Sequence, residues 1–340
     1  MSTALTAASP HTAVSLGRSI AGRIGFLPVL LVVLVAGMSA IDAQFYGIIN
    51  ILNILRNASF LAIVACGQAL VIIAGGFDLS VGAVVALVSV VTAKTMAAVA
   101  ATFPGNNTVI IASGVAAGLG CGLAVGLVNG FCVAKLKVSG FVVTLGTMSA
   151  TAGVGLMITS GIPVYGMPDV FVKGFGRAQV FGLPTAVYVA VAVVLVMMFA
   201  QQRTLFGRYV YAIGGNVDAA VVSGVLIQRH IVGTYVVSSV LAALTGILLT
   251  AQVGSGQASF GGDRMMLLQS IAAAVIGGVS LRGGVGRVEI VTISALFLTI
   301  LGNALNLLHI DSRLQPVFLG VIMVAAVALD ELSQRRKSRV

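Results

Sequence analysis

Long uncharged apolar runs constrain the fold of this chain more than any other feature of its sequence. Residues 57–77, 95–134, 138–168 and 290–310 contain no Asp, Glu, Lys or Arg, and charged residues make up only 8% of the chain. A helix of about 20 predominantly apolar residues crosses a bilayer, so each run is long enough for one span or two. The mean hydropathy of +1.11 also indicates that much of the chain lies in a membrane. The sequence therefore predicts a polytopic membrane protein.

The runs predict about ten membrane spans of about 20 residues each. Backbone groups in lipid must be satisfied within their own segment, and the runs lack the alternating pattern of a transmembrane β-barrel, so we expect helices. The fold class is all-α, a polytopic helical bundle at residues 25–329 between a tail at 1–24 and a basic tail at 330–340. The expected spans lie near residues 25–41, 57–75, 79–99, 108–130, 141–159, 184–200, 231–250, 265–279, 288–307 and 314–329.

The net charge of +10 comes from Lys and Arg residues whose positions match the expected topology. With the N-terminus in the cytoplasm, thirteen of the 19 Lys and Arg residues fall on the cytoplasmic side, as the positive-inside rule requires. We therefore expect both termini to lie in the cytoplasm. The basic charge is explained by insertion in a lipid bilayer, and we expect no nucleic-acid partner. Arg18 and Arg23 before the run 25–41 also fit a secretory signal peptide, but the many later spans favour an uncleaved first helix.

The chain lacks the residues that an energy source would need. Each lysine follows a residue other than Gly, which excludes a Walker A loop. Cys66, Cys121 and Cys132 are scattered and no H-E-x-x-H motif is present, so we expect no metal and no cofactor. Asp78 and Glu289 fall at expected cytoplasmic ends of spans, and not at the midplane, where ion-coupled transporters carry ionisable groups.

Three classes of function remain open at this point. The first is a transport pathway that a separate chain drives, and the second is a secondary transporter or facilitator that works alone. The third is a membrane enzyme with a buried site. The absence of G-x-S-x-G and of a carboxylate pair within one span counts against the enzyme.

A polar segment at residues 201–230 interrupts the apolar sequence. Gly214 and Gly215 supply a turn, Asn216 can cap a helix, and Asp218 is favourable in its first turn. Because Gly224 can end that helix, the pattern predicts a short helix at 217–223. It is interpreted either as an ordinary amphipathic connector or as a helix that docks on a cytoplasmic partner.

A second glycine-containing turn lies between the second and third expected spans. Gly75 and Gly76 break the span, and Asp78 with Ser80 can cap the next one. The structural interpretation is a cap and tight turn at the cytoplasmic face. The functional alternative is a gate or a partner contact.

Small and polar residues inside the spans predict close helix packing. Glycines recur every four residues along the fourth expected span, which lets another helix approach closely, within the chain or between subunits. Polar uncharged side chains such as Asn303 and Asn306 either join helices by hydrogen bonds or line a pathway for a neutral solute. The repeating glycines are Gly114, Gly118, Gly122, Gly126 and Gly130.

Four ordered motifs resemble those of the ribose/xylose/galactose-type ABC sugar importer permeases, within the branched-chain amino acid/ribose permease superfamily. The resemblance runs from about Leu52 to the last span. Val217 and Val221 depart from the family pattern, which commonly has an acidic and a basic residue there. The motifs are G-G-F-D-L-S-V-G at 75–82, N-G-x-x-V-A-K-L-K-V-x-x-F-V-V-T-L-G-T-M at 129–148, F-G-R-Y-V-Y-A-I-G-G-N-x-x-A-A-x-x-S-G at 206–224, and I-G-G-V-S-L-R-G-G-V-G at 276–286.

The resemblance implies a permease subunit in a bacterial inner membrane, with an architecture similar to that of the cobalamin importer permease. Its partners would be a second permease copy or paralogue, a cytoplasmic ATPase that binds ATP and Mg, and a periplasmic sugar-binding protein. Ribose is the first expected substrate, with xylose, galactose, arabinose or a polyol as alternatives. The loop 201–230 would carry the ATPase-coupling helix, with candidate residues Gly214, Gly215, Asn216, Asp218, Ala219, Ala220, Ser223 and Gly224.

Overall fold

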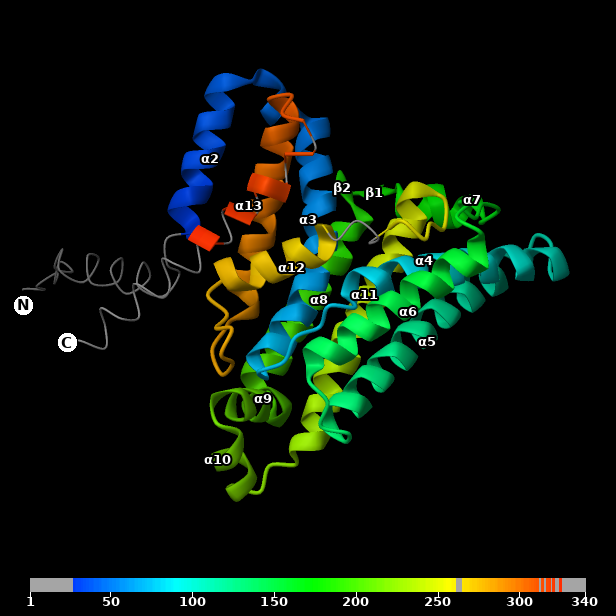
Figure 1. The fold of residues 1–340 in the computed structure, drawn as a ribbon. Helices are drawn as coiled ribbons and strands as arrows, with labels where there is room; N and C mark the ends of the chain where they lie inside the picture. Colours follow the sequence, from blue (N-terminus) through cyan, green and yellow to red (C-terminus); the bar gives the residue numbers. More distant parts are fainter. Residues whose placement is uncertain are drawn as a thin grey trace, which may run out of the picture.

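A computed structural model describes residues 27–260 and 265–311, together with 313, 314, 316–318, 320, 321, 324 and 325. The described chain is predominantly helical, as expected (Figure 1). One small hairpin joins Gln179–Val180 (β1) to Leu183–Pro184 (β2) in antiparallel register. The expected tails at 1–24 and 330–340 lie outside the described residues, as does half of the expected span at 314–329.

Seven helices in the described part of the chain are long and apolar enough to cross a membrane. Two shorter apolar helices, α2 (Leu27–Ile41) and α12 (Met265–Ile276), lie where spans are also expected. The seven are α3 (Ile48–Ile73), α4 (Val81–Thr102), α5 (Asn107–Ala134), α6 (Gly140–Thr159), α8 (Thr185–Arg203), α11 (Ile227–Val253) and α13 (Val288–Leu307).

The helix α3 begins well before the expected residue 57. Its first turns carry Asn50, Asn53 and Arg56, which lower the hydropathy without breaking the helix. The Arg56 guanidinium donates to Asn53 Oδ1 at 3.1 Å along the same helix face. The Asn50 amide bonds to the neighbouring helix α13. Paired polar groups therefore extend the helix beyond its apolar run.

The helix α3 runs through the middle of the molecule between two packed groups (Figure 1). On one side α4, α5 and α11 enclose an apolar cluster that includes Val85 and Ile247, and α6 packs on α4. On the other side α3 packs with α8, α12 and α13 around residues such as Ile72 and Leu298. The helix α3 thus contributes side chains to both cores.

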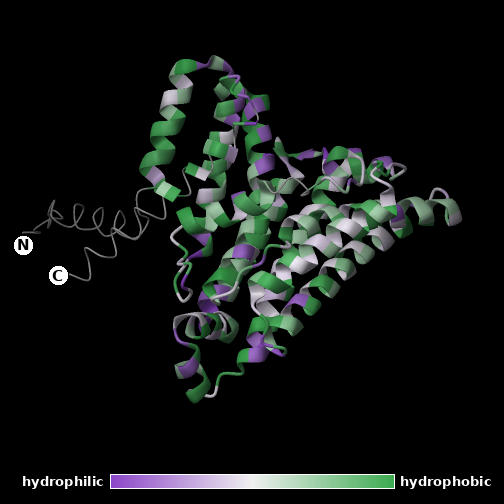
Figure 2. Cartoon of the chain, viewed as in Figure 1, coloured by the Kyte–Doolittle hydropathy of each residue, from purple (hydrophilic) through white to green (hydrophobic). Residues whose placement is uncertain are grey.

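Polar structure gathers at the two ends of the bundle (Figure 2). At one end, α9 (Leu205–Gly215) and α10 (Val217–Val222) project below the long helices, as Figure 1 shows. At the other end lie α7 (Asp169–Phe171), a short π-helical turn η2 (Val172–Gly176) and the β1–β2 hairpin. A 3₁₀ turn, η1 (Ala43–Tyr46), joins α2 to α3. The projecting α9–α10 element is therefore the natural place to look for a partner contact.

Candidate functional site

The helix α10 lies over Val217–Val222, close to the expected range 217–223. The Asn216 side chain caps it by accepting a hydrogen bond from the Ala219 N–H at 2.9 Å. Asp218 lies in its first turn, where its charge favours the helix. Gly224 follows the helix with a φ of +77°, a left-handed conformation that suits glycine. Local sequence chemistry therefore accounts for both ends of this short helix.

The exposed surface of α10 is largely apolar. Val222 is 89% exposed, and Val217, Val221 and Leu226 are also exposed, while Ala220 is buried. Asp218 and Ser223 lie exposed beside these side chains. We call Val217, Val221, Val222 and Leu226 the α10 apolar tip. A set of aliphatic side chains at a projecting helix is suited to a groove on another protein.

The base of α10 is formed by backbone contacts between three segments that are distant in sequence. A Cβ atom added to Gly214 would lie 1.7 Å from the Ile73 carbonyl oxygen and 2.5 Å from the Gly284 nitrogen. A Cβ atom added to Gly283 would lie 3.1 Å from the Cα atoms of both Gly75 and Gly214. We call Gly75, Gly214, Gly283 and Gly284 the glycine junction. At Gly214, Gly283 and Gly284 only a residue without a side chain permits this approach, whereas Gly75 favours glycine because its φ is +83°.

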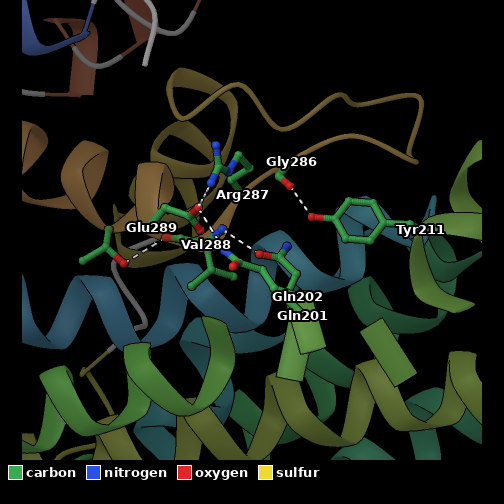
Figure 3. A network of polar contacts seen from close by, with 8 residues as sticks. Gln201, Gln202, Tyr211, Gly286, Arg287, Val288 and Glu289 are labelled. Atoms are coloured by element: carbon green, nitrogen blue, oxygen red, sulfur yellow. Dashed lines mark hydrogen bonds and ion pairs between the residues drawn. The ribbon is translucent and has the colours of Figure 1, made fainter. Parts of the chain in front are cut away.

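Polar contacts fasten α8 and α9 to the first turn of α13 and to the loop before it, as Figure 3 shows. The Gln201 side chain accepts from the Val288 N–H at 3.0 Å, and the Tyr211 hydroxyl donates to the Gly286 carbonyl. The Gln202 amide donates to Glu289 at 3.1 Å. Glu289 also pairs with Arg287. This network, which the sequence analysis missed, joins the α9–α10 element to the loop that carries Gly283 and Gly284.

The Tyr211 phenol acts as a neutral donor in this network. Burial raises its pKa, the negative charge of Glu289 raises the pKa further, and the Arg287 cation lowers it. A phenol of this kind keeps its proton at neutral pH. The hydroxyl therefore remains available to donate to Gly286.

The segment 74–80 between α3 and α4 turns back toward α11 and carries Asp78, which is fully buried. One carboxylate oxygen accepts from the Ser80 N–H at 3.0 Å and from the Ser80 hydroxyl at 2.6 Å. The other accepts from the Ser238 hydroxyl on α11 at 2.8 Å. Ser80 in turn accepts from the Asn129 amide on α5 at 2.9 Å. The segment is thus fastened to two long helices.

The burial of Asp78 differs from the expectation that it merely caps the next helix at a surface turn. The carboxylate does accept the Ser80 N–H near the start of α4, but it also reaches across to α11. Burial raises the pKa of Asp78, and its hydrogen bonds with Ser80 and Ser238 lower it in part. The carboxylate therefore has a structural role that no local pattern indicates.

A cavity of about 270 Å³ lies beside this segment. Its polar lining comes from Ser139, Thr234 and Tyr235, and the backbone of Gly75 and Gly76 closes one side. The Tyr235 hydroxyl donates to the Phe77 carbonyl at 3.1 Å. A change in the position of residues 74–77 would therefore change the shape of this cavity.

The repeating glycines of α5 all face other helices of the same chain. Cβ atoms added to Gly114 and Gly118 would meet α4, at Met96 and Thr92 respectively. Cβ atoms added to Gly122, Gly126 and Gly130 would meet α11 within 3 Å. The glycine face of α5 is thus used for packing within the chain.

The two asparagines of α13 are placed differently. Asn303 exchanges hydrogen bonds with Asn50 of α3 at 2.7 and 3.1 Å. Asn306 lies exposed one turn further along. The structure therefore places Asn303 in a contact between helices, and it does not bring Asn303 or Asn306 to the cavity beside segment 74–80.

Known proteins that match this chain are similar to it over nearly their whole length. A protein-family model described as "Branched-chain amino acid transport system / permease component" matches residues 50–327. The L-arabinose transport system permease protein AraH of Escherichia coli is 37% identical over 334 residues, which cover 98% of this chain and 97% of AraH. The ribose import permease protein RbsC of Bacillus subtilis is 38% identical over 309 residues, which cover 91% of each chain. The D-allose transport system permease protein AlsC of Escherichia coli is 34% identical over 306 residues, which cover 89% of this chain and 90% of AlsC. No solved structure matches the chain significantly.

Proposed function

The chain belongs to the family of branched-chain amino acid transport system permease components, and from that premise we propose that it is the membrane permease subunit of an ATP-driven sugar importer. The substrate is a monosaccharide, because relatives that match nearly the whole chain are named for L-arabinose, ribose and D-allose. Ribose remains the first choice. Xylose, galactose, arabinose and polyols share the hydroxyl chemistry that such a pathway requires.

The observation that carries the proposal is the α10 apolar tip. A capped helix with Val222 89% exposed, at the projecting end of an apolar bundle, fits a groove on a cytoplasmic ATPase. The ATPase binds ATP and Mg, and its closure pulls on α10. Asn216 holds the helix N-terminus, Asp218 and Ser223 flank the tip, and the aliphatic side chains fill the groove.

The proposed assembly follows from this role. Two permease copies, identical or paralogous, form the pathway between them, with the ATPase at the α10 side and a periplasmic sugar-binding protein opposite. The chain crosses the bacterial inner membrane about ten times, counting about 20 residues for each span, in an architecture like that of the cobalamin importer permease. The loop 201–230 and both termini lie in the cytoplasm, consistent with the positive-inside rule.

A stand-alone secondary transporter is the second candidate, because Asp78 is a buried ionisable group of the kind that ion-coupled transporters use. Three hydrogen bonds from Ser80 and Ser238 occupy both of its oxygens. This arrangement fits a structural anchor better than an ion site. The importer therefore remains the better-supported function.

The test is purification of the tagged permease from its native membrane in gentle detergent, followed by identification of the co-purifying chains and an ATPase assay. We expect an ATPase to co-purify with the native chain and to be lost in Val222→Asp. The matched control is Phe181→Asp, which alters a 98% exposed side chain at the opposite end of the bundle. Sugar uptake by the purified chain alone, in vesicles without ATP, would instead support a secondary transporter.

A further inference from the structure

The glycine junction lies directly between α10 and the segment that carries Asp78. Gly214 lies in the last turn of α9, which ends at Gly215, and the capping residue Asn216 leads from there into α10. On the other side of the junction, Ile73 ends α3, and Gly75, the second residue of segment 74–80, has a φ of +83°. The Gly284 N–H donates to the Ile73 carbonyl at 2.8 Å. Three backbones thus meet without an intervening side chain.

A contact of this kind transmits movement efficiently. Side chains can absorb a small displacement by changing rotamer, whereas backbone atoms in van der Waals contact cannot. A Cβ atom added to Gly284 would lie 2.7 Å from the Gly215 Cα atom. The Tyr211 hydroxyl also holds the loop at Gly286. A displacement of α10 therefore moves the end of α3 and the loop 283–286 together.

The displacement would continue into the long helices. Segment 74–80 is fastened to α11 through Asp78 and Ser238, and to α5 through Ser80 and Asn129. Gly75 and Gly76 border the 270 Å³ cavity, which Tyr235 and Gly140 also line. Movement at the junction thus changes the shape of this cavity and reaches the helices α3, α5 and α11 together.

We propose that the glycine junction is the mechanical link between ATPase docking and the transport pathway, and that Gly214 and Gly283 are positioning residues for this coupling. The proposal rests on the proposed function as an ATPase-driven permease. In the resting arrangement the junction holds segment 74–80 against α11. When α10 is pulled, Gly214 carries the end of α3 at Ile73 and the loop at Gly284 with it, and segment 74–80 changes the shape of the cavity beside Tyr235.

The first test uses two glycines in the same loop that both have positive φ angles. Gly283 has a φ of +86° and a Cβ atom there would lie 2.7 Å from the Gly214 carbonyl oxygen. Gly278 has a φ of +74° and a Cβ atom there would meet nothing within 4 Å. Gly283→Ala and Gly278→Ala therefore impose similar backbone strain, but only Gly283→Ala crowds the junction.

Each variant is purified with its ATPase and reconstituted with the binding protein, and the sugar transported per ATP hydrolysed is measured. We expect Gly283→Ala to keep the ATPase bound and hydrolysing ATP, while sugar per ATP falls about fivefold or more, the low end of typical coupling between sites. Gly278→Ala is expected to match the native ratio. Equal ratios for both variants would overturn the proposal.

Tyr211→Phe provides a second measurement that adds no atoms to the junction. It removes the hydrogen bond to Gly286 and is expected to lower sugar per ATP in the same direction as Gly283→Ala. A native ratio in Tyr211→Phe, together with failure of Gly283→Ala to assemble, would also count against the link. If the native chain itself retains no ATPase, the proposed function fails, and this result is distinct from failure of the junction.

Discussion

Asp78 and Ser238 are 160 positions apart in the chain, and a 2.8 Å hydrogen bond joins the Ser238 hydroxyl to the Asp78 carboxylate. The bond connects the break between α3 and α4 to the middle of α11. Ser80 and Asn129 extend it to α5. A loop that would otherwise be free to shift is therefore held within the helix bundle.

The burial of Asp78 predicts a specific dependence of stability on pH. Its pKa is raised in the folded protein, so the folded state binds its proton more readily than the unfolded state does. The stabilising contribution is complete below the unfolded pKa of about 3.9 and is lost as pH rises through the folded pKa. Asp78→Asn removes this titration.

The measurement is the thermal midpoint of the purified permease across a pH series, for the native chain and for Asp78→Asn. We expect the difference, native minus variant, to decrease as the pH rises from about 4. Asp42→Asn is the matched control, because Asp42 is only half-buried and its side chain accepts one local hydrogen bond, from the Gln44 N–H of η1. If the difference in thermal midpoint between the native chain and Asp78→Asn did not change with pH, burial would not raise the pKa of Asp78.

Packing of α5 predicts that its glycines differ sharply in their tolerance of a side chain. A Cβ atom at Gly126 would lie 2.8 Å from the Val236 Cα atom, whereas a Cβ atom at Gly120 would meet nothing within 4 Å. Gly126→Ala is expected to destabilise the chain by about 1–3 kcal/mol through overpacking. Gly120→Ala should be neutral or slightly stabilising, because Ala favours helix over Gly. Thermal unfolding in detergent checks the pair, and similar midpoints would show that α5 does not pack on α11 in this way.

The sequence predicts those features that depend on neighbouring residues. Apolar runs predict the long helices, and the order Gly-Gly-Asn-x-Asp predicts α10 and its cap within a residue. The end of α12 at Ile276 also has a local cause, since Gly278 takes a φ of +74° two residues later. Hydropathy alone places the start of α3 too late, because it does not register the pairing of Asn53 with Arg56.

The glycine junction and the contacts of Asp78 could not be predicted in the same way. Gly75, Gly214 and Gly283 each read as a local helix breaker, and nothing in their separate neighbourhoods indicates that they meet. Asp78 reads as a helix cap, because its partner Ser238 is one of many serines in the spans. These relationships arise from the packing of distant segments, which periodicity and spacing do not encode.

The pair Asn50 and Asn303 predicts that Asn303 contributes to helix packing more than to substrate passage. Asn303→Ala leaves the Asn50 amide without its partner on α13. A double-mutant cycle with Asn50→Ala is expected to give a coupling of about 0.6 kcal/mol, the average for such bonds in a membrane protein, and at most about 1.7 kcal/mol. Sugar affinity should stay unchanged. A large rise in KM with unchanged stability would place Asn303 in the pathway instead.

The cap of α10 predicts a graded effect on ATPase binding. Asn216→Ala removes the acceptor for the Ala219 N–H, which costs about 1 kcal/mol of helix stability. Binding of the ATPase then requires ordering of the helix first, so its affinity should fall about fivefold, the factor that corresponds to 1 kcal/mol. Asn216→Ser keeps a capping oxygen and should retain near-native affinity. Hydrogen exchange at residues 217–222 reports the helix, and titration with the ATPase reports the affinity. An equal loss of ATPase affinity in both variants, while residues 217–222 of Asn216→Ser keep native hydrogen-exchange rates, would show that the Asn216 amide contacts the ATPase directly.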